Sequence, residues 1–243
     1  MLKKIDFLAF SPILLASMCL AANPGEVPLS AMKLNGHARL LSDGYIRFTH
    51  NISQASSAFV PTPFALGPND SFRAYFAYES HQEFGQCIAD GLAFVAQNTP
   101  AGASYLGEDG SGLGFFTGTA SPAIGVTFDY YANEITGTPA NAAAIATPDG
   151  VDLLWTTPHP EALSGPDAQR YVWVAYDNPT RIMQVFYSDT QTRPATPLLE
   201  TILPFDLSTV FGGQAYFGVT AGTGSCYSEQ YLLNFALNVV NVQ

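Results

Sequence analysis

Short apolar runs separated by Gly, Pro, Asp and Asn fill most of the chain, and helical periodicity is hard to find. Leu92–Ala96 and Ile124–Phe128 are continuous apolar runs of strand length. Ser71–Ser80 alternates aromatic with smaller or polar residues, as a sandwich strand does. Gly36–Ile52 predicts one or two more strands, with Asp43-Gly44 as a tight turn. The pattern therefore favours an all-β antiparallel sandwich or barrel over an α/β fold.

Length and charge narrow the function classes. The 243 residues suffice for one β-rich domain with a full core, and 21 Gly and 17 Pro interrupt it often. The net charge is −11, from 9 basic and 20 acidic residues. Nucleic acid and anionic membrane surfaces are therefore disfavoured as partners, because both require clustered Lys and Arg.

The first residues resemble a secretory signal. Lys3 and Lys4 precede an apolar run from Phe7 to Leu20, and small residues follow the run. We therefore expect residues 1–21 to be a cleaved signal peptide. Residues 22–243 would then form a single domain. A lipoprotein acylated at Cys19 is the alternative, which Met18 disfavours. The run is too short and broken to span a bilayer, so we expect a secreted or periplasmic protein without a membrane span.

Two cysteines, Cys87 and Cys226, remain after that cleavage. An even pair in an exported chain favours a disulfide over two separate buried thiols. The four histidines are scattered without metal-ligand spacing, and no G-x-S-x-G motif is present. Asn51 and Asn69 match the glycosylation sequon, which matters only in a eukaryotic source.

Residues 84–133 hold the candidate chemistry. Asp90-Gly91 precedes the first apolar run, Asp129 ends the second, and Asn133 follows four residues later. A loop rich in Gly and Ser, Gly102–Gly118, lies between them. Carboxylates accept hydrogen bonds from sugar hydroxyls, while carboxamides and glycine N–H groups donate them. The stretch therefore predicts a site for a polyhydroxy ligand.

Five segments, in order, resemble the legume or L-type lectin domain of the concanavalin A-like superfamily. The resemblance covers most of the mature chain, and its fold is an antiparallel jelly-roll sandwich. The segments are SSAFVPTPFAL (Ser56–Leu66), ADGLAF (Ala89–Phe94), GVTFDYYAN (Gly125–Asn133), YVWVAYDNPTRIMQVFYSD (Tyr171–Asp189) and DLSTVFGGQAYFGVTAGTG (Asp206–Gly224).

The resemblance implies a sugar site. Asp90, joined to Ala89 by a cis peptide bond, would accept bonds from two sugar hydroxyls. A Gly110–Gly112 N–H and the Asn133 amide would donate, and Tyr131 or Tyr130 would stack on the sugar ring. The loop with Gly222, Thr223 and Gly224 would select the sugar, and both cysteines would lie beside the binding loops. Asp-Gly and Asn are also ordinary turn residues, which is the alternative explanation for them.

The metal ligands of the resembled family are only partly present. Asp129, the Tyr131 carbonyl and Asn133 match, but Thr127, Thr138 and Ala142–Ala144 stand where Glu, Asp and His are expected. We therefore expect no transition metal. Calcium prefers six or more oxygens, so this calcium set is incomplete unless Glu134 or Asp152 adds a carboxylate.

These observations predict a secreted, non-catalytic carbohydrate-binding protein whose partners are glycans. Calcium is the ion that it could hold. Association between copies of the chain stays an open alternative. The alternative from another class is a structural or adhesive module that has lost the sugar site. A glycoside hydrolase of the same fold is disfavoured, because Thr127 occupies the nucleophile position and no Glu follows Asp129 at the required spacing.

Overall fold

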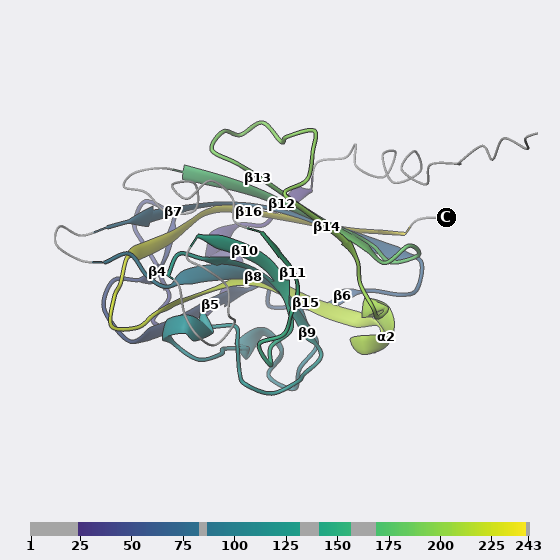
Figure 1. Ribbon diagram of the computed structural model, residues 1–243, viewed down its shortest axis with the longest axis horizontal. Coiled ribbons are helices and arrows are strands. Elements are labelled where there is room, and N and C mark those ends of the chain that lie inside the picture. Colours follow the sequence, from purple (N-terminus) through teal and green to yellow (C-terminus); the bar gives the residue numbers. More distant parts are fainter. Residues whose placement is uncertain (1–23, 83–86, 132–140, 157–168, 242–243) are drawn as a thin grey trace, which may run out of the picture.

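The computed structural model describes residues 24–82, 87–131, 141–156 and 169–241. In these ranges most elements are β-strands, which form two antiparallel sheets that pack face to face (Figure 1). The predicted all-β sandwich is therefore confirmed. No helix within these ranges has the length and apolar character that a bilayer span requires.

Each sheet is named here after one of its central strands. The β7 sheet contains, in spatial order, β14 (Leu199–Ile202), β13 (Ile182–Ser188), β12 (Gln169–Asp177), β7 (Asp70–His81), β16 (Glu229–Asn241), β4 (Ile46–Thr49) and β3 (Arg39–Leu40), with β1 (Gly25–Glu26) beside β16. The β8 sheet contains β11 (Asp152–Thr156), β10 (Ala142–Ala146), β9 (Ala123–Asp129), β8 (Gly91–Gln97), β15 (Gln214–Thr223), β5 (Gln54–Phe59) and β2 (Lys33–Gly36), with β6 (Phe64–Ala65) beside β15.

The short helices lie in the connections. They are the 3₁₀ turns η1 (Leu29–Ala31), η2 (Gly102–Ser104) and η3 (Gly110–Gly112), and the single-turn helix α2 (Leu207–Val210). The Asp206 carboxylate caps α2 by accepting from the Thr209 N–H at 3.2 Å, which satisfies one of the amides left without a partner at a helix start.

Aromatic side chains from both sheets form the core between them. Phe72 and Phe76 of β7 meet Phe94 of β8, and the Phe72 and Phe217 ring centroids lie 4.9 Å apart. All four are fully buried, and rings at this separation add favourable contacts to their burial. The predicted strands at Leu92–Ala96, Ile124–Phe128 and Ser71–Ser80 are confirmed as parts of β8, β9 and β7.

A second apolar cluster covers the other face of the β8 sheet. The segment between β8 and β9 supplies Tyr105, Leu113 and Phe115, which pack against Phe59 and Val95. The glycine-rich loop predicted from the sequence is therefore partly a core element. This packing fixes the position of η3, which borders the candidate site.

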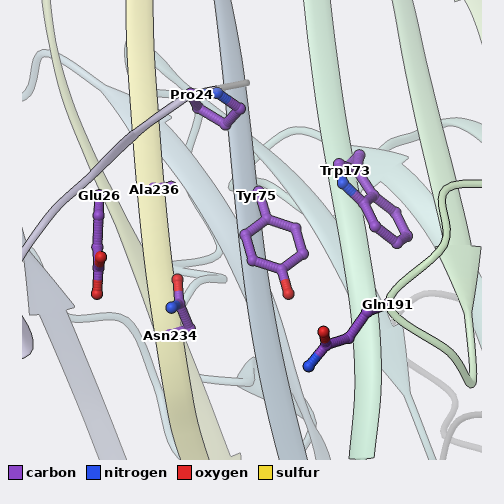
Figure 2. A pocket seen from close by; sticks show the side chains of 7 residues that line it. All are labelled: Pro24, Glu26, Tyr75, Trp173, Gln191, Asn234 and Ala236. Carbon is purple, nitrogen blue, oxygen red and sulfur yellow. The ribbon is translucent and has the colours of Figure 1, made fainter. Parts of the chain in front are cut away.

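The outer face of the β7 sheet carries a different pair of aromatic residues, Tyr75 and Trp173. They lie opposite each other on β7 and β12, and Figure 2 shows their rings side by side.

Candidate functional site

Three neighbouring strands of the β8 sheet meet at one end of the sheet, where β8 begins and β9 and β15 end. Their register pairs Gly91 of β8 with Asp129 of β9 on one side and with Gly222 of β15 on the other. Gly91 has φ +149°, and a Cβ there would lie 2.1 Å from the Phe128 carbonyl oxygen. Only glycine fits this position, which explains the Asp-Gly pair in physical terms.

The backbone of Asp90 is held between β15 and β9. Its N–H donates to the Gly222 carbonyl at 3.1 Å, and its carbonyl accepts from the Tyr130 N–H at 2.7 Å. The Ala89–Asp90 peptide bond is cis, as the resemblance implied.

The Asp90 carboxylate lies where three loops converge. Asp90 is only 6% exposed, and its Oδ2 has no hydrogen-bond partner among the described residues. A Cβ added at Gly224 would lie 3.2 Å from this oxygen and 3.3 Å from the Gly110 Cα, and one added at Gly110 would lie 4.0 Å from Oδ2. The two glycines thus leave narrow space beside a carboxylate oxygen that lacks a donor.

Burial is the main cause that raises the pKa of Asp90 to about 6. The Gly224 backbone N–H lies near enough to the carboxylate to lower the pKa, although it forms no hydrogen bond with Oδ2, and the Asp109 carboxylate adds to the rise. A hydroxyl that donates to Asp90 would favour the ionised form, so ligand binding and ionisation reinforce each other.

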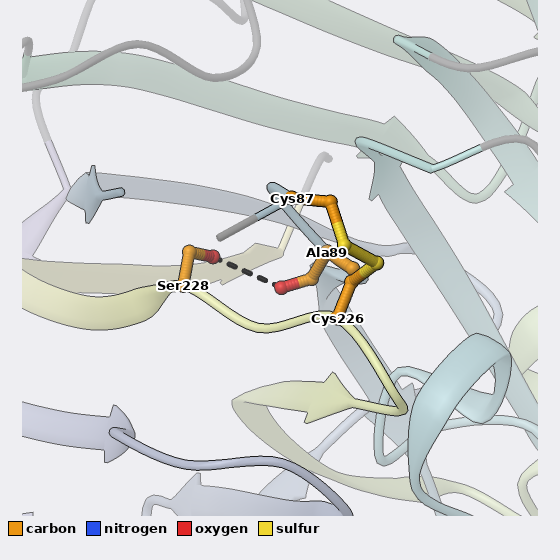
Figure 3. The surroundings of a disulfide bond; sticks show 4 residues. All are labelled: Cys87, Ala89, Cys226 and Ser228. Atoms are coloured by element: carbon orange, nitrogen blue, oxygen red, sulfur yellow. Dashed lines mark hydrogen bonds between the residues drawn. A yellow bond between two sulfur atoms is a disulfide. The ribbon is translucent and has the colours of Figure 1, made fainter. Parts of the chain in front are cut away.

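The disulfide predicted between Cys87 and Cys226 is confirmed, with a Cα–Cα distance of 5.2 Å. It joins the segment that leads to Asp90 to the loop after Gly224. Figure 3 shows Ser228 beside it, where the hydroxyl donates to the Ala89 carbonyl at 3.0 Å. The disulfide and this hydrogen bond both fix the position of the Ala89–Asp90 segment.

Buried polar side chains beneath the site were not identified from the sequence. Ser228 and Gln230 are fully buried, and the Gln230 Nε2 donates to the Gly222 carbonyl at 2.9 Å. The Ser80 hydroxyl donates to the Ser228 hydroxyl at 3.2 Å. Their one sequence signal is a polar residue in or directly before a strand, and its inward direction is known only once the strand register is known.

The remaining predicted loop residues have different environments. The Gly112 N–H donates to the Asp109 carbonyl at 2.8 Å, so it is used within η3, while Gly110 borders the Asp90 carboxylate. Thr223 is buried, and its hydroxyl donates to the Asn51 carbonyl at 2.7 Å. The Thr223 side chain therefore holds the loop, and Gly222 and Gly224 form its surface toward Asp90.

The structure distinguishes the two candidate stacking residues. Tyr130 is buried in the core between the sheets, and burial strongly raises the pKa of its hydroxyl. Tyr131 is 43% exposed, and its N–H donates to Asp129 Oδ1 at 3.1 Å. Only Tyr131 can therefore offer a ring face to a ligand. Asn133 lies outside the described residues.

A sequence profile of the Legume lectin domain family matches residues 26–243. The chain belongs to the legume lectin domain family. It is 28% identical over 222 residues to an L-type lectin-domain containing receptor kinase VIII.2 of Arabidopsis thaliana, covering 82% of this chain and 29% of that protein. The chain thus spans about a third or less of that curated relative.

Solved legume lectins share the fold. The lectin from Bauhinia forficata in complex with GalNAc has a TM-score of 0.74 at 20% identity, covering 88% of this chain and 95% of that chain. Basic winged bean lectin with Tn-antigen has a TM-score of 0.73 at 19% identity, covering 90% and 96%. The jelly-roll sandwich expected from the resemblance is confirmed.

The metal ligands of this lectin family do not all fit the described part of the chain. Thr127 and Ala144 lie opposite each other on β9 and β10, and both are buried. The resemblance places the family's Glu at Thr127 and its His near Ala142–Ala144. The described ranges hold no group of three or more His, Cys, Asp or Glu side chains placed to bind a metal ion. Asn133, Glu134 and Thr138 lie outside them.

The suggestion that Asp152 could complete a calcium site at Asp129 is wrong. Asp152 pairs with Ala146, which pairs with Gly125, whereas Asp129 pairs with Ala142 at the other end of β10. Four strand residues separate the two positions, about 13 Å along the sheet. A calcium ion held by Asp129 could not reach Asp152 at the roughly 2.5 Å that calcium–oxygen contacts require.

Proposed function

We propose that this chain is a non-catalytic carbohydrate-binding protein whose site lies where Asp90, Gly110 and Gly224 converge. The observation that carries the proposal is the buried Asp90 Oδ2, which has no hydrogen-bond partner among the described residues and borders two glycines. A buried acceptor without a donor is costly, and a sugar hydroxyl would supply the donor. The family assignment independently supports carbohydrate binding by the chain, while the position at Asp90 rests on the structure and on the resemblance of the ADGLAF segment.

The rest of the site follows from the surrounding loops. The Gly110 segment and the Asn133 amide would donate to the sugar, and the exposed Tyr131 ring would stack on it. Gly222, Thr223 and Gly224 would form the loop that determines which sugar fits. The chain's own contribution is a preformed site, because the disulfide and the Ser228 hydrogen bond hold Asp90 before any ligand arrives.

We expect at most one weakly bound calcium ion, because its set of ligands is incomplete. Asp129, the Tyr131 carbonyl and Asn133 would hold it. A site with one certain carboxylate is expected in the weak, roughly millimolar class. We expect no transition metal, because Thr127 stands where the resemblance places a Glu ligand and Ala142–Ala144 where it places a His ligand.

The first residues of the chain support a proposal about where the protein is located. We propose that residues 1–21 are a signal peptide and that the mature chain is secreted or periplasmic, where it meets glycans and where its disulfide is stable. One of the family's solved lectins is bound to GalNAc and another to Tn-antigen, so glycans ending in GalNAc are the first probes to test.

A structural or adhesive module without sugar binding is the second candidate. The observation that favours it is the pair Thr127 and Ala144, which replaces metal ligands in an otherwise intact sandwich. In that case no glycan would bind, and the Asp90 segment would serve only to connect the strands.

A glycan array followed by calorimetry, with and without EDTA, tests the proposal. Asp90→Ala should weaken binding about a hundredfold, on the order of 3 kcal/mol, because charge-assisted hydrogen bonds are lost. Circular dichroism should show an unchanged fold. Asp43→Asn, in the exposed turn between β3 and β4, is the matched control and should bind as the wild type does. Unchanged affinity in Asp90→Ala would refute the site, and a wild type that binds no glycan would favour the structural module.

A further inference from the structure

The outer face of the β7 sheet carries a continuous row of side chains on five adjacent strands. The register aligns Phe186 of β13, Trp173 of β12, Tyr75 of β7, Ala236 of β16 and Glu26 of β1. The residues that flank them along each strand face the core, such as Val172, Val174 and Phe76. The row therefore lies on the face directed away from the core and from Asp90.

Part of this row lines a cavity of about 290 Å³. Its lining consists of two aromatic, two small apolar and three polar residues: Tyr75, Trp173, Pro24, Ala236, Glu26, Asn234 and Gln191. Figure 2 shows Glu26 on one side of the cavity and Gln191 reaching in from the other, toward the Tyr75 hydroxyl. Ligand cavities begin at roughly 300 Å³, so this volume suits a small ligand such as a single sugar residue.

The two rings form an open platform. Their centroids lie 5.3 Å apart and their planes are inclined at 40°. Ala236, next to Tyr75 in the row, has a side chain too small to fill the space between Tyr75 and Glu26. An aromatic cage for a cation needs rings that surround the charge, whereas two side-by-side rings offer one broad apolar face.

The polar residues at the rim complement that face. Glu26 provides carboxylate acceptors, and the Asn234 and Gln191 carboxamides each provide donors and an acceptor. A pyranose ring has one apolar face of C–H groups and hydroxyls around its edge, so it needs both an aromatic face and a polar rim. This combination of stacking surface and rim fits a sugar better than it fits a purely apolar or purely ionic ligand.

We propose that this cavity is a second carbohydrate-binding site, called the outer-face site, which stacks a sugar on Tyr75 and Trp173. It lies on the opposite side of the sandwich from Asp90, so the two sites do not share residues. A single copy of the chain with both sites could bind two glycan branches at once and gain avidity without association between copies.

Tryptophan fluorescence gives a direct test, because the chain contains two tryptophans and Trp155 lies in the β8 sheet. In a Trp155→Phe, Asp90→Ala protein, Trp173 is the only tryptophan and the first site is disabled. Titration with methyl glycosides of galactose, glucose, mannose and GalNAc should give a saturable change for at least one sugar. The expected dissociation constant is on the order of 1 mM.

Two further substitutions in that protein test whether the rim residues contact the sugar. Glu26→Gln and Asn234→Ala, at the rim, should each weaken the titration about tenfold while leaving the thermal unfolding midpoint unchanged. Glu200→Gln, exposed on β14 of the same sheet, is the matched control and should change neither.

Three outcomes would overturn the outer-face site. The first is no fluorescence change with any of the four sugars, and the second is a sugar response that Glu26→Gln leaves intact. The third is a wild-type dimer that Trp173→Ala converts to a monomer in light scattering, which would make this face an interface between copies. The first two outcomes are measured in a protein without Asp90, and the third measures oligomeric state, so none of them depends on the proposed function.

Discussion

Gly224 lies so close to Asp90 that a methyl group on Gly224 would stand 3.2 Å from the carboxylate Oδ2. The same methyl would stand 3.3 Å from the Cα of Gly110. These contacts are tighter than ordinary van der Waals contacts, so either the carboxylate or the η3 loop would have to move. The size of the residue at position 224 therefore controls the geometry of the site.

Gly224→Ala is expected to weaken glycan binding about tenfold or more, because a site displaced by a fraction of an ångström loses well-aligned hydrogen bonds. Its thermal stability should change little. Gly25→Ala in β1, where the added Cβ meets only an ordinary contact at 3.6 Å, is the control and should leave the calorimetric affinity of the Asp90 site unchanged. Equal affinities for both variants would show that the glycan does not bind against Gly224.

Asp152 gives the stability of the fold a dependence on pH. Both its carboxylate oxygens are buried without hydrogen-bond partners in the described ranges, and burial raises its pKa from 3.8 to about 6. Between these values the folded state binds more protons than the unfolded state, so stability falls as pH rises through that window. The loss of stability caused by burying the charged carboxylate is fully present above about pH 6.

Asp152→Asn is therefore expected to raise the free energy of unfolding at pH 7.5 by about 1 kcal/mol, after allowance for partial solvent access. Urea unfolding should show no gain at pH 4, where the wild-type carboxyl is largely protonated. Asp149→Asn, in the turn between β10 and β11, is the control for the substitution itself. A gain of equal size at both pH values would contradict the explanation. Asp90, whose pKa is also about 6, should retain its own share of the pH dependence in this variant.

The disulfide is expected to stabilise the domain strongly, because Cys87 and Cys226 are separated by 139 residues. Closing a loop of this length in the unfolded chain is worth about 3–5 kcal/mol by chain entropy. The Cys87→Ser, Cys226→Ser protein should show that loss in urea unfolding, and reduced, alkylated wild type should match it. An unchanged unfolding midpoint would mean that native contacts alone hold the two segments.

The same double variant should also bind glycans more weakly at low temperature, where it remains folded. The disulfide joins the segment that carries Asp90 to the loop that carries Gly224, so its removal lets the two separate. Calorimetry at 10 °C would measure this loss. Full affinity in the folded variant would show that the Ser228 hydrogen bond to Ala89 is sufficient to hold Asp90.

Some of this protein could be determined from the sequence because the signals are local or ordered along the chain. The apolar runs of β8 and β9 and the Asp43-Gly44 turn each depend on a few consecutive residues. The Asp90-Gly91 pair could also be identified as a candidate site, because the motif that surrounds it is short. The disulfide was predicted from the number of cysteines and from the expectation that the chain is exported. Five short motifs in a fixed order then identified the family, which no single one of them could have done.

Only the tertiary structure decided which of these residues meet. Asp152 was a plausible partner for Asp129 until the register of β9, β10 and β11 placed it at the other end of the sheet. Tyr130 and Tyr131 are adjacent and identical in sequence, yet one is buried and the other exposed. The alignment of Trp173 with Tyr75, 98 positions apart by their numbers, depends on strand pairing in the same way. Register between strands distant in sequence is set by the packing of the whole core, so no local pattern contains it.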